Sequence, residues 1–161
     1  MPVINVTEGL DNLTITITSE FAAAPERVWQ VFADPRQLEK WWGPEGFPAS
    51  VTTHEFRPGG RVDYAMTGPD GTSYPGWWRI EEVDEPHRFS YRDGFSDAEG
   101  NPIEEKMVNL TVTEFAAIES GTRMTSTSTY GCAADLQQVL EMGVEEGATS
   151  AINQIDALLA A

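Results

Sequence analysis

Aromatic, thioether and hydroxyl side chains alternate along several segments of the chain. Side chains at alternate positions of a strand point to the same side of a sheet. The sets that share a face in this way are Tyr64 with Met66, Trp78 with Ile80, Phe89 with Tyr91, and Met124 with Ser126, Ser128 and Tyr130. If Met124 faces an interior, the hydroxyls of Ser126 and Ser128 face it too and need a partner from the backbone, water or a bound molecule. This combination favours a site for a hydrophobic small molecule with one or two polar groups.

Small residues occur in the C-terminal segment where a helix would favour leucine. Gly143, Gly147 and Ala151 are four residues apart and therefore lie on one face of a helix. They either allow the helix to approach a sheet closely or leave a cavity, and the sequence leaves both alternatives open. The candidate cavity residues are therefore Tyr64, Met66, Trp78, Ile80, Phe89, Tyr91, Ser126, Ser128, Gly143 and Gly147.

The residue types that catalysis and metal binding require are sparse. His54 and His87 fall on different expected strands, and the chain has neither a Ser–His–Asp order nor an H-E-x-x-H spacing. Its one cysteine, Cys132, has no second thiol with which to form a disulfide or a zinc site. We expect no catalytic residue, no metal and no cofactor. If the cavity hosts a reaction instead, His54 or Tyr64 is the candidate acid or base.

A sheet that holds a helix would position these side chains. Residues 13–19 alternate apolar and hydroxyl side chains, and six more strands are expected over 49–56, 61–67, 74–83, 87–95, 106–115 and 122–130. Two short helices follow the first strand, with Pro25 and Pro35 in their first turns and Asp34 as the cap of the second. Apolar residues recur every three or four positions from about residue 133 to 161, which predicts one long amphipathic helix. The pattern predicts an α+β fold, with a seven-stranded antiparallel sheet around that helix.

The size and charge of the chain limit its organisation and partners. The 161 residues suit a single domain over residues 13–161, preceded by an N-terminal extension over 1–12. The formal net charge of −16 would repel nucleic acid and an anionic membrane, so neither is an expected partner. No signal peptide or membrane-spanning stretch is visible, and a single cysteine suits a reducing compartment. We therefore expect a cytoplasmic protein.

Several motifs resemble one known family. They are Phe21, Pro25, Val28-Trp29, Phe32, Asp34-Pro35, Leu38, Trp41-Trp42-Gly43-Pro44, Arg57-Pro58-Gly59-Gly60, Pro69-Asp70-Gly71, Gly76, Gly121-Thr122-Arg123 and Glu146-Gly147. In this order they resemble the activator of heat-shock protein 90 ATPase homologue (AHSA-type) family of the SRPBCC superfamily, which also contains START and Bet v 1-like domains. The resemblance implies a helix-grip fold. Ala148 departs from it, because the family commonly has tryptophan after the helix glycine, and a missing indole would enlarge a cavity or be compensated elsewhere.

Three functions are compatible with these residues and this resemblance. We favour a non-enzymatic binding domain with an internal cavity for a hydrophobic or aromatic small molecule, with a stress or chaperone role that the resemblance implies. The second is an enzyme similar to the polyketide cyclases and dehydratases of the superfamily. The third is a heat-shock chaperone partner that acts through its surface. The family's eukaryotic founder stimulates the chaperone and has a separate N-terminal domain without a counterpart before Leu13, so we expect little stimulation here.

Overall fold

The chain forms one antiparallel sheet flanked by helices, and the computed structural model describes residues 2–104 and 108–160. The strands are β1 (Val3–Gly9), β2 (Thr14–Phe21), β3 (Ala49–His54), β4 (Arg61–Thr67), β5 (Ser73–Asp84), β6 (Arg88–Phe95), β7 (Asn109–Ile118) and β8 (Gly121–Thr129). They pair in the order β1-β2-β8-β7-β6-β5-β4-β3. The helices are α1 (Pro25–Ala33), α2 (Pro35–Trp41), α3 (Ala133–Glu141), α4 (Val144–Asn153) and α5 (Ile155–Ala160).

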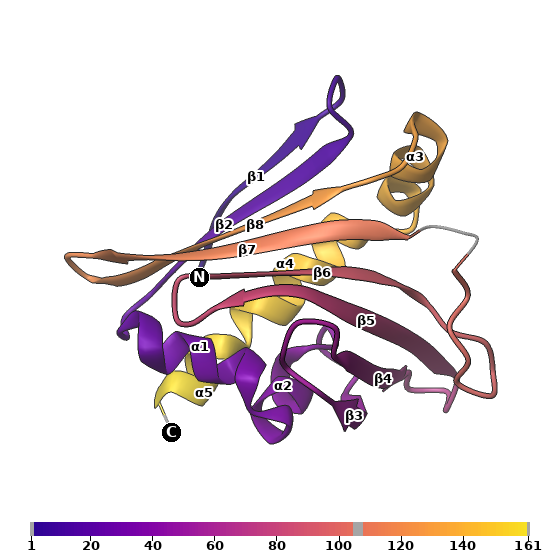
Figure 1. Cartoon of the computed structure of the whole chain (residues 1–161), viewed down its shortest axis with the longest axis horizontal. Helices are drawn as coiled ribbons and strands as arrows, with labels where there is room; N and C mark the ends of the chain where they lie inside the picture. Colours follow the sequence, from indigo (N-terminus) through magenta and orange to yellow (C-terminus); the bar gives the residue numbers. More distant parts are fainter. Residues whose placement is uncertain (1, 105–107, 161) are drawn as a thin grey trace.

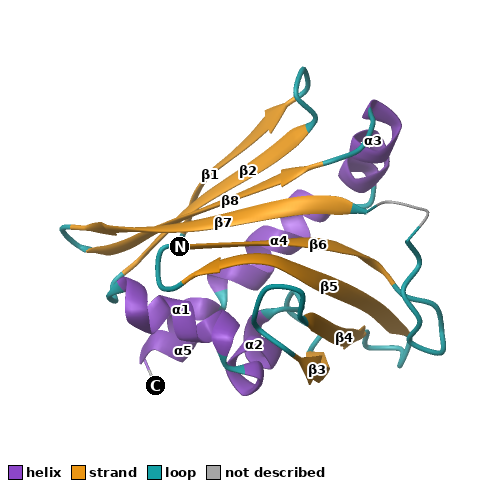
Figure 2. Ribbon diagram, viewed as in Figure 1, coloured by secondary structure: helices purple, strands orange, loops and turns teal. Residues whose placement is uncertain are grey.

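The sheet curves around the C-terminal part of the chain (Figure 1). In Figure 2, α1, α2 and α5 gather at one end of the molecule, α3 lies at the other end, and α4 runs behind the sheet between them. The segment α1–α2 carries the chain from β2, near one edge of the sheet, to β3 at the opposite edge. The α+β architecture with an antiparallel sheet and a C-terminal helical segment is confirmed and is consistent with a helix-grip fold.

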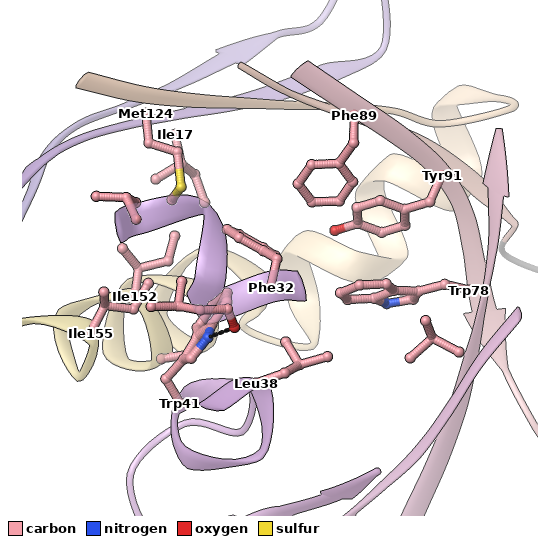
Figure 3. Packing of buried hydrophobic residues seen from close by; sticks show 14 of the residues in the cluster. Ile17, Phe32, Leu38, Trp41, Trp78, Phe89, Tyr91, Met124, Ile152 and Ile155 are labelled. Carbon is pink, nitrogen blue, oxygen red and sulfur yellow. Dashed lines mark hydrogen bonds between the residues drawn. The ribbon is translucent and has the colours of Figure 1, made fainter. Parts of the chain in front are cut away.

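Local sequence signals explain how α1 and α2 begin and how they are joined. A proline occupies the first turn of each helix, where a missing N–H costs nothing. The Asp34 carboxylate accepts a hydrogen bond from the Arg36 backbone N–H at 2.9 Å and so caps α2. The Trp41 Nε1–H donates to the Val31 carbonyl oxygen at 2.8 Å, shown by the dashed line in Figure 3, and this bond ties α2 to α1.

Aromatic rings fill the space between α1 and the sheet. The Trp29 ring meets Phe89 of β6 and Phe115 of β7 edge to face, with centroids 5.5 and 5.4 Å apart. Phe32 meets Phe89 and Trp41 in the same way, at 4.9 Å from each. Such pairs contribute about 0.5–1.5 kcal/mol each beyond the area that they bury. This cluster therefore fixes the two short helices against the middle of the sheet.

The strands of the sheet differ from the expectation at two places. In the part of the chain that the structure describes, the sheet has eight strands rather than seven, because residues 3–9, which the sequence assigned to an N-terminal extension, form β1 and pair with β2. The burial of β1 does not follow a period of two, so alternation could not reveal it. The strand expected over 106–115 is β7, and residues 106 and 107 lie outside the described residues.

The expected C-terminal helical segment is present, but it is divided rather than continuous. Helix α3 ends at Glu141 and α4 starts at Val144, because Gly143 between them has φ +82°, in the left-handed region. Only glycine adopts that conformation without a steric penalty. A further short helix, α5, follows Gln154. The glycine therefore turns the chain from α3, at one end of the molecule, into α4.

Gly143→Ala is expected to destabilise the protein. Alanine in the left-handed region costs about 1–2 kcal/mol, which corresponds to a melting temperature lower by several degrees. Gly147→Ala is the matched control, since Gly147 lies in α4 and an added Cβ meets nothing within 4 Å. That control should gain about 0.5–1 kcal/mol from helix propensity. Thermal unfolding of both variants measures the difference, and equal effects would contradict the helix break at Gly143.

Candidate functional site

A pocket of about 350 Å³ lies between the inner face of the sheet and the C-terminal helices. Strands β2, β4, β6, β7 and β8 form one side, and α1, α2, α3 and α4 contribute most of the rest. Its volume falls within the range of small-molecule sites, about 300–1,000 Å³. Most of the lining is apolar, with contributions such as Ile17, Met66, Met124 and Ile152. The sheet and helices thus leave space in which a small organic molecule fits.

Stacked aromatic rings lie in and directly behind the pocket wall that β4 and β6 form. The Trp78 and Tyr91 rings stack with centroids 4.2 Å apart, and Phe89 continues the stack at 5.6 Å from Tyr91. Figure 3 shows these three rings in one column. Trp42, directly after α2, meets Trp78 edge to face at 4.7 Å and Tyr64 at 5.7 Å. This wall is rigid, because each ring is held by at least one other.

A glycine in β5 allows Tyr64 to lie flat against the strand. Gly76 pairs with Tyr64 across β4 and β5, and a Cβ on Gly76 would overlap the Tyr64 ring. A strand glycine of this kind marks a close approach of another group. Gly76 therefore determines where the Tyr64 phenol enters the pocket lining.

The hydroxyl groups expected to face the interior do so and are paired across strands. The Ser128 and Thr111 hydroxyl oxygens are 2.9 Å apart, and those of Ser126 and Thr113 are 3.1 Å apart. Both pairs join β8 to β7, where these residues stand directly opposite each other. The partners that the serines required are thus supplied by the neighbouring strand. Each serine still lines the pocket and keeps further hydrogen-bonding capacity for a bound molecule.

Asp93 of β6 is a pocket residue that sequence reasoning missed. It lies two residues after Tyr91, so the alternation of Phe89 and Tyr91 continues to Asp93 and was the signal that could have found it. Its Oδ1 atom is buried and has no hydrogen-bond partner among the described residues. Removal from water disfavours the carboxylate and raises the pKa of Asp93 to about 7, and the Asn109 side chain, which hydrogen-bonds to the carboxylate, opposes this rise only in part. Asp93 therefore exchanges a proton near neutral pH.

Three phenols line the same pocket as Asp93. Burial, and after it the charge of Asp93, raises the pKa values of Tyr64, Tyr91 and Tyr130 above their ordinary range. These phenols therefore stay protonated at neutral pH and can donate hydrogen bonds. The arrangement combines donors and one titratable acceptor inside an otherwise apolar space.

The ten candidate cavity residues separate into three groups. Those that line the pocket are Tyr64, Met66, Tyr91, Ser126, Ser128 and Gly147. Trp78, Ile80 and Phe89 are fully buried in the core instead, and Trp78 and Phe89 support Tyr91 from either side. Gly143 is outside the lining and forms the break between α3 and α4.

Gly147 is open to the pocket. Of the two alternatives for the small residues, close contact between helix and sheet or an open cavity, the structure has the cavity at this position. A Cβ on Gly147 would meet no atom within 4 Å, so helix and sheet do not touch there. Ala148 also lines the pocket. The small side chains of α4 thus contribute to the open space.

Of the side chains considered for acid–base and thiol chemistry, Tyr64 lines the pocket, whereas His54 and Cys132 do not. His54 Nε2 is 2.9 Å from the Phe32 carbonyl oxygen, and its ring stacks on Phe56 outside the pocket lining. Cys132 is exposed and precedes α3. Within residues 2–104 and 108–160, no three His, Cys, Asp or Glu side chains gather as metal ligands would. Across that same part of the chain, no helix combines the length and apolarity needed to cross a membrane.

Comparisons with known proteins agree with this architecture. The family described as "Activator of Hsp90 ATPase homolog 1-like protein" matches residues 22–160. The chain is similar to the crystal structure of protein Ms6760 from Mycobacterium smegmatis, with 59% identity, a TM-score of 0.91, and coverage of 98% of this chain and 97% of that chain. A solution structure from Arthrobacter aurescens shares 44% identity with a TM-score of 0.93, over 98% of this chain and 92% of that one. A comparison with curated proteins found no match.

Proposed function

Because this chain belongs to the family of activator of Hsp90 ATPase homolog 1-like proteins, and because a pocket lies between its sheet and α4, we propose that it binds a hydrophobic or aromatic small molecule. The observation that carries the proposal is the pocket itself, an apolar space of about 350 Å³ with a few convergent polar groups. Binding sites for small organic molecules have this composition. The stress or chaperone role that the family description implies stays a prediction.

Two features of the pocket support a binding site rather than a packing defect. The lining combines aromatic rings on β4 and β6, which rings in the core support, with paired hydroxyls on β7 and β8, so its shape is held by contacts on the protein side. Gly147 and Ala148 keep the opposite wall open. A rigid pocket loses little conformational entropy when a ligand enters, which favours binding.

An uncharged apolar fluorophore is expected to bind and to stabilise the protein. N-phenyl-1-naphthylamine, which is neutral at pH 7 and fluoresces more strongly in apolar surroundings, should give a saturable rise in fluorescence at one molecule per chain. At a hundred times its dissociation constant it should raise the free energy of unfolding by about 2.7 kcal/mol. Titration and thermal unfolding measure the two effects. A linear, unsaturable signal without a shift in melting temperature would refute the proposal.

An enzyme is the second candidate function, and the near-neutral pKa of Asp93 favours it. An acid–base group works best when its pKa lies close to the working pH, and Asp93 meets that condition inside the pocket, whereas His54 does not line it. In this form Asp93 would assist loss of water from a flexible substrate. Mass spectrometry of the gently purified parent and of Asp93→Asn distinguishes the candidates. A dehydrated molecule in the parent whose hydrated form co-purifies with Asp93→Asn favours the enzyme, whereas a molecule that is unchanged or lost in the variant favours a binding protein.

A further inference from the structure

Resting on the proposed function, we propose that the pocket selects apolar molecules that carry one positively charged amine, whose nitrogen is bound by the Asp93 carboxylate. The pocket is polar at one end and apolar at the other. Asp93, Tyr64, Tyr91 and Tyr130 supply the polar end. Figure 3 shows Ile17, Met124 and Ile152 on the opposite side of Phe32 from Tyr91 and Trp78. A ligand that fits has one polar head and a hydrophobic body.

The pocket lining that the structure describes gives the Asp93 carboxylate no counter-charge. Among the lining residues that the structure describes, none is lysine, arginine or histidine, and the remaining titratable groups are the three phenols. A buried carboxylate without a cation is unstable, and a positively charged ligand would supply both the missing charge and a donor for Oδ1. An ammonium group satisfies both needs at once, whereas an alcohol satisfies only the second.

The surroundings of Asp93 also favour a cation over an anion. The aromatic rings of Tyr64 and Trp42 also line the pocket, and an ammonium group is attracted to the face of such a ring. The chain as a whole carries a formal net charge of −16, and such a field concentrates cations and repels anions. The Asp93 carboxylate, the aromatic rings and the negative field of the whole chain therefore all favour a positively charged ligand.

Three naphthalene derivatives of nearly equal size test the proposal. They are 1-naphthylmethylamine, 1-naphthylmethanol and 1-naphthoic acid, which are cationic, neutral and anionic at pH 8. Isothermal titration calorimetry with the intact protein is expected to give the amine at least a tenfold lower Kd than the alcohol, and the acid the weakest binding. In Asp93→Asn the advantage of the amine over the alcohol should fall below threefold. Glu119→Gln, which removes one charge at the exposed β7–β8 turn, should keep the full advantage.

The pH dependence gives a second readout. Binding the amine requires the Asp93 carboxylate, whereas the free pocket takes up a proton as the pH falls through about 7. The amine stays protonated over this range, so its Kd in the parent should rise about tenfold from pH 8 to pH 6, while the Kd of the alcohol changes little. The phenols facing Asp93 remain neutral throughout, because burial raises their pKa values.

The outcomes separate this proposal from the proposed function. Equal Kd values for the amine and the alcohol, or tightest binding of the alcohol or the acid, overturn the amine selectivity and leave the binding function standing. Absence of binding by all three, together with absence of binding by N-phenyl-1-naphthylamine, overturns both. An amine preference that Asp93→Asn retains overturns the assignment of its nitrogen to Asp93.

Discussion

Asp93→Asn is expected to be more stable than the parent at pH 8, with an advantage in melting temperature that grows by about 4–8 °C between pH 5 and pH 8. The pKa of Asp93 in the folded protein is raised by burial to about 7, from an ordinary value of 3.8. Because the folded state binds this proton more tightly than the unfolded chain, the group stabilises the fold fully below its pKa in the unfolded chain. That contribution is lost as the pH rises through its pKa in the folded protein. Asparagine has no charge to bury, so the variant escapes the loss.

The size of this effect follows from the two pKa values. Between pH 5 and 7 the folded protein holds a proton that the unfolded chain has released, and two pH units correspond to roughly 2.7 kcal/mol. Asp93 is partly exposed, so solvent screening reduces this effect to on the order of 2 kcal/mol. Thermal unfolding of parent and variant at several pH values measures the difference. Glu119→Gln should follow the parent, and parallel curves for Asp93→Asn and the parent would show that Asp93 is fully solvated.

Gly147→Leu is expected to abolish binding while the protein stays folded. The leucine side chain would extend into the pocket, since the Cβ of residue 147 meets no atom within 4 Å. Leucine favours a helix over glycine by roughly 0.5–1 kcal/mol, so the melting temperature should be retained or rise. Fluorescence titration with N-phenyl-1-naphthylamine should give a Kd at least tenfold higher than that of the parent.

Gly147→Ala is the matched control for the pocket-filling variant. It adds one methyl group to the same wall and should bind the fluorophore nearly as tightly as the parent does. A Gly147→Leu protein that unfolds at a lower temperature and binds as before would mean that residue 147 packs against the sheet and that the fluorophore binds elsewhere. Unchanged stability with unchanged binding would also place the site outside the pocket.

The regular elements were accessible from the sequence because their signals are local. Alternation in residues 13–19 and the prolines at 25 and 35 determine β2, α1 and α2 through contacts within a few residues. The strand β1 lacked such a signal, since its burial does not alternate and its place depends on pairing with β2. The helix break at Gly143 was equally hidden, because a glycine inside an apolar helical pattern does not reveal its own φ angle.

The sequence predicted which side chains face the interior, but not which of them line the pocket. Alternation correctly brought Tyr64, Met66 and Tyr91 to the inner face, yet it could not separate residues that line a pocket from those packed in the core, such as Phe89 and Ile80. That separation depends on which helix covers each part of the sheet. The partners of the two serines depend on the register of β7 and β8, which residue types alone do not determine.

Asp93 was missed for a different reason. A carboxylate on a strand is normally assigned to the solvated face, because an unpaired buried charge is costly. Its position two residues after Tyr91 contradicted that assignment, and the structure follows the alternation. Polar residues that continue an inward-facing series are therefore the ones to examine first for a functional role.

Methionine methyl NMR tests most directly whether the pocket is the ligand site. Met66 and Met124 line the pocket, whereas Met142 is 59% exposed and outside the lining. In protein labelled with ¹³C at the methionine methyl groups, bound N-phenyl-1-naphthylamine is expected to give intermolecular nuclear Overhauser effects to Met66 and Met124 and none to Met142. Contacts to Met142 alone, or saturable binding without contacts to either pocket methionine, would contradict a ligand site between the sheet and α4.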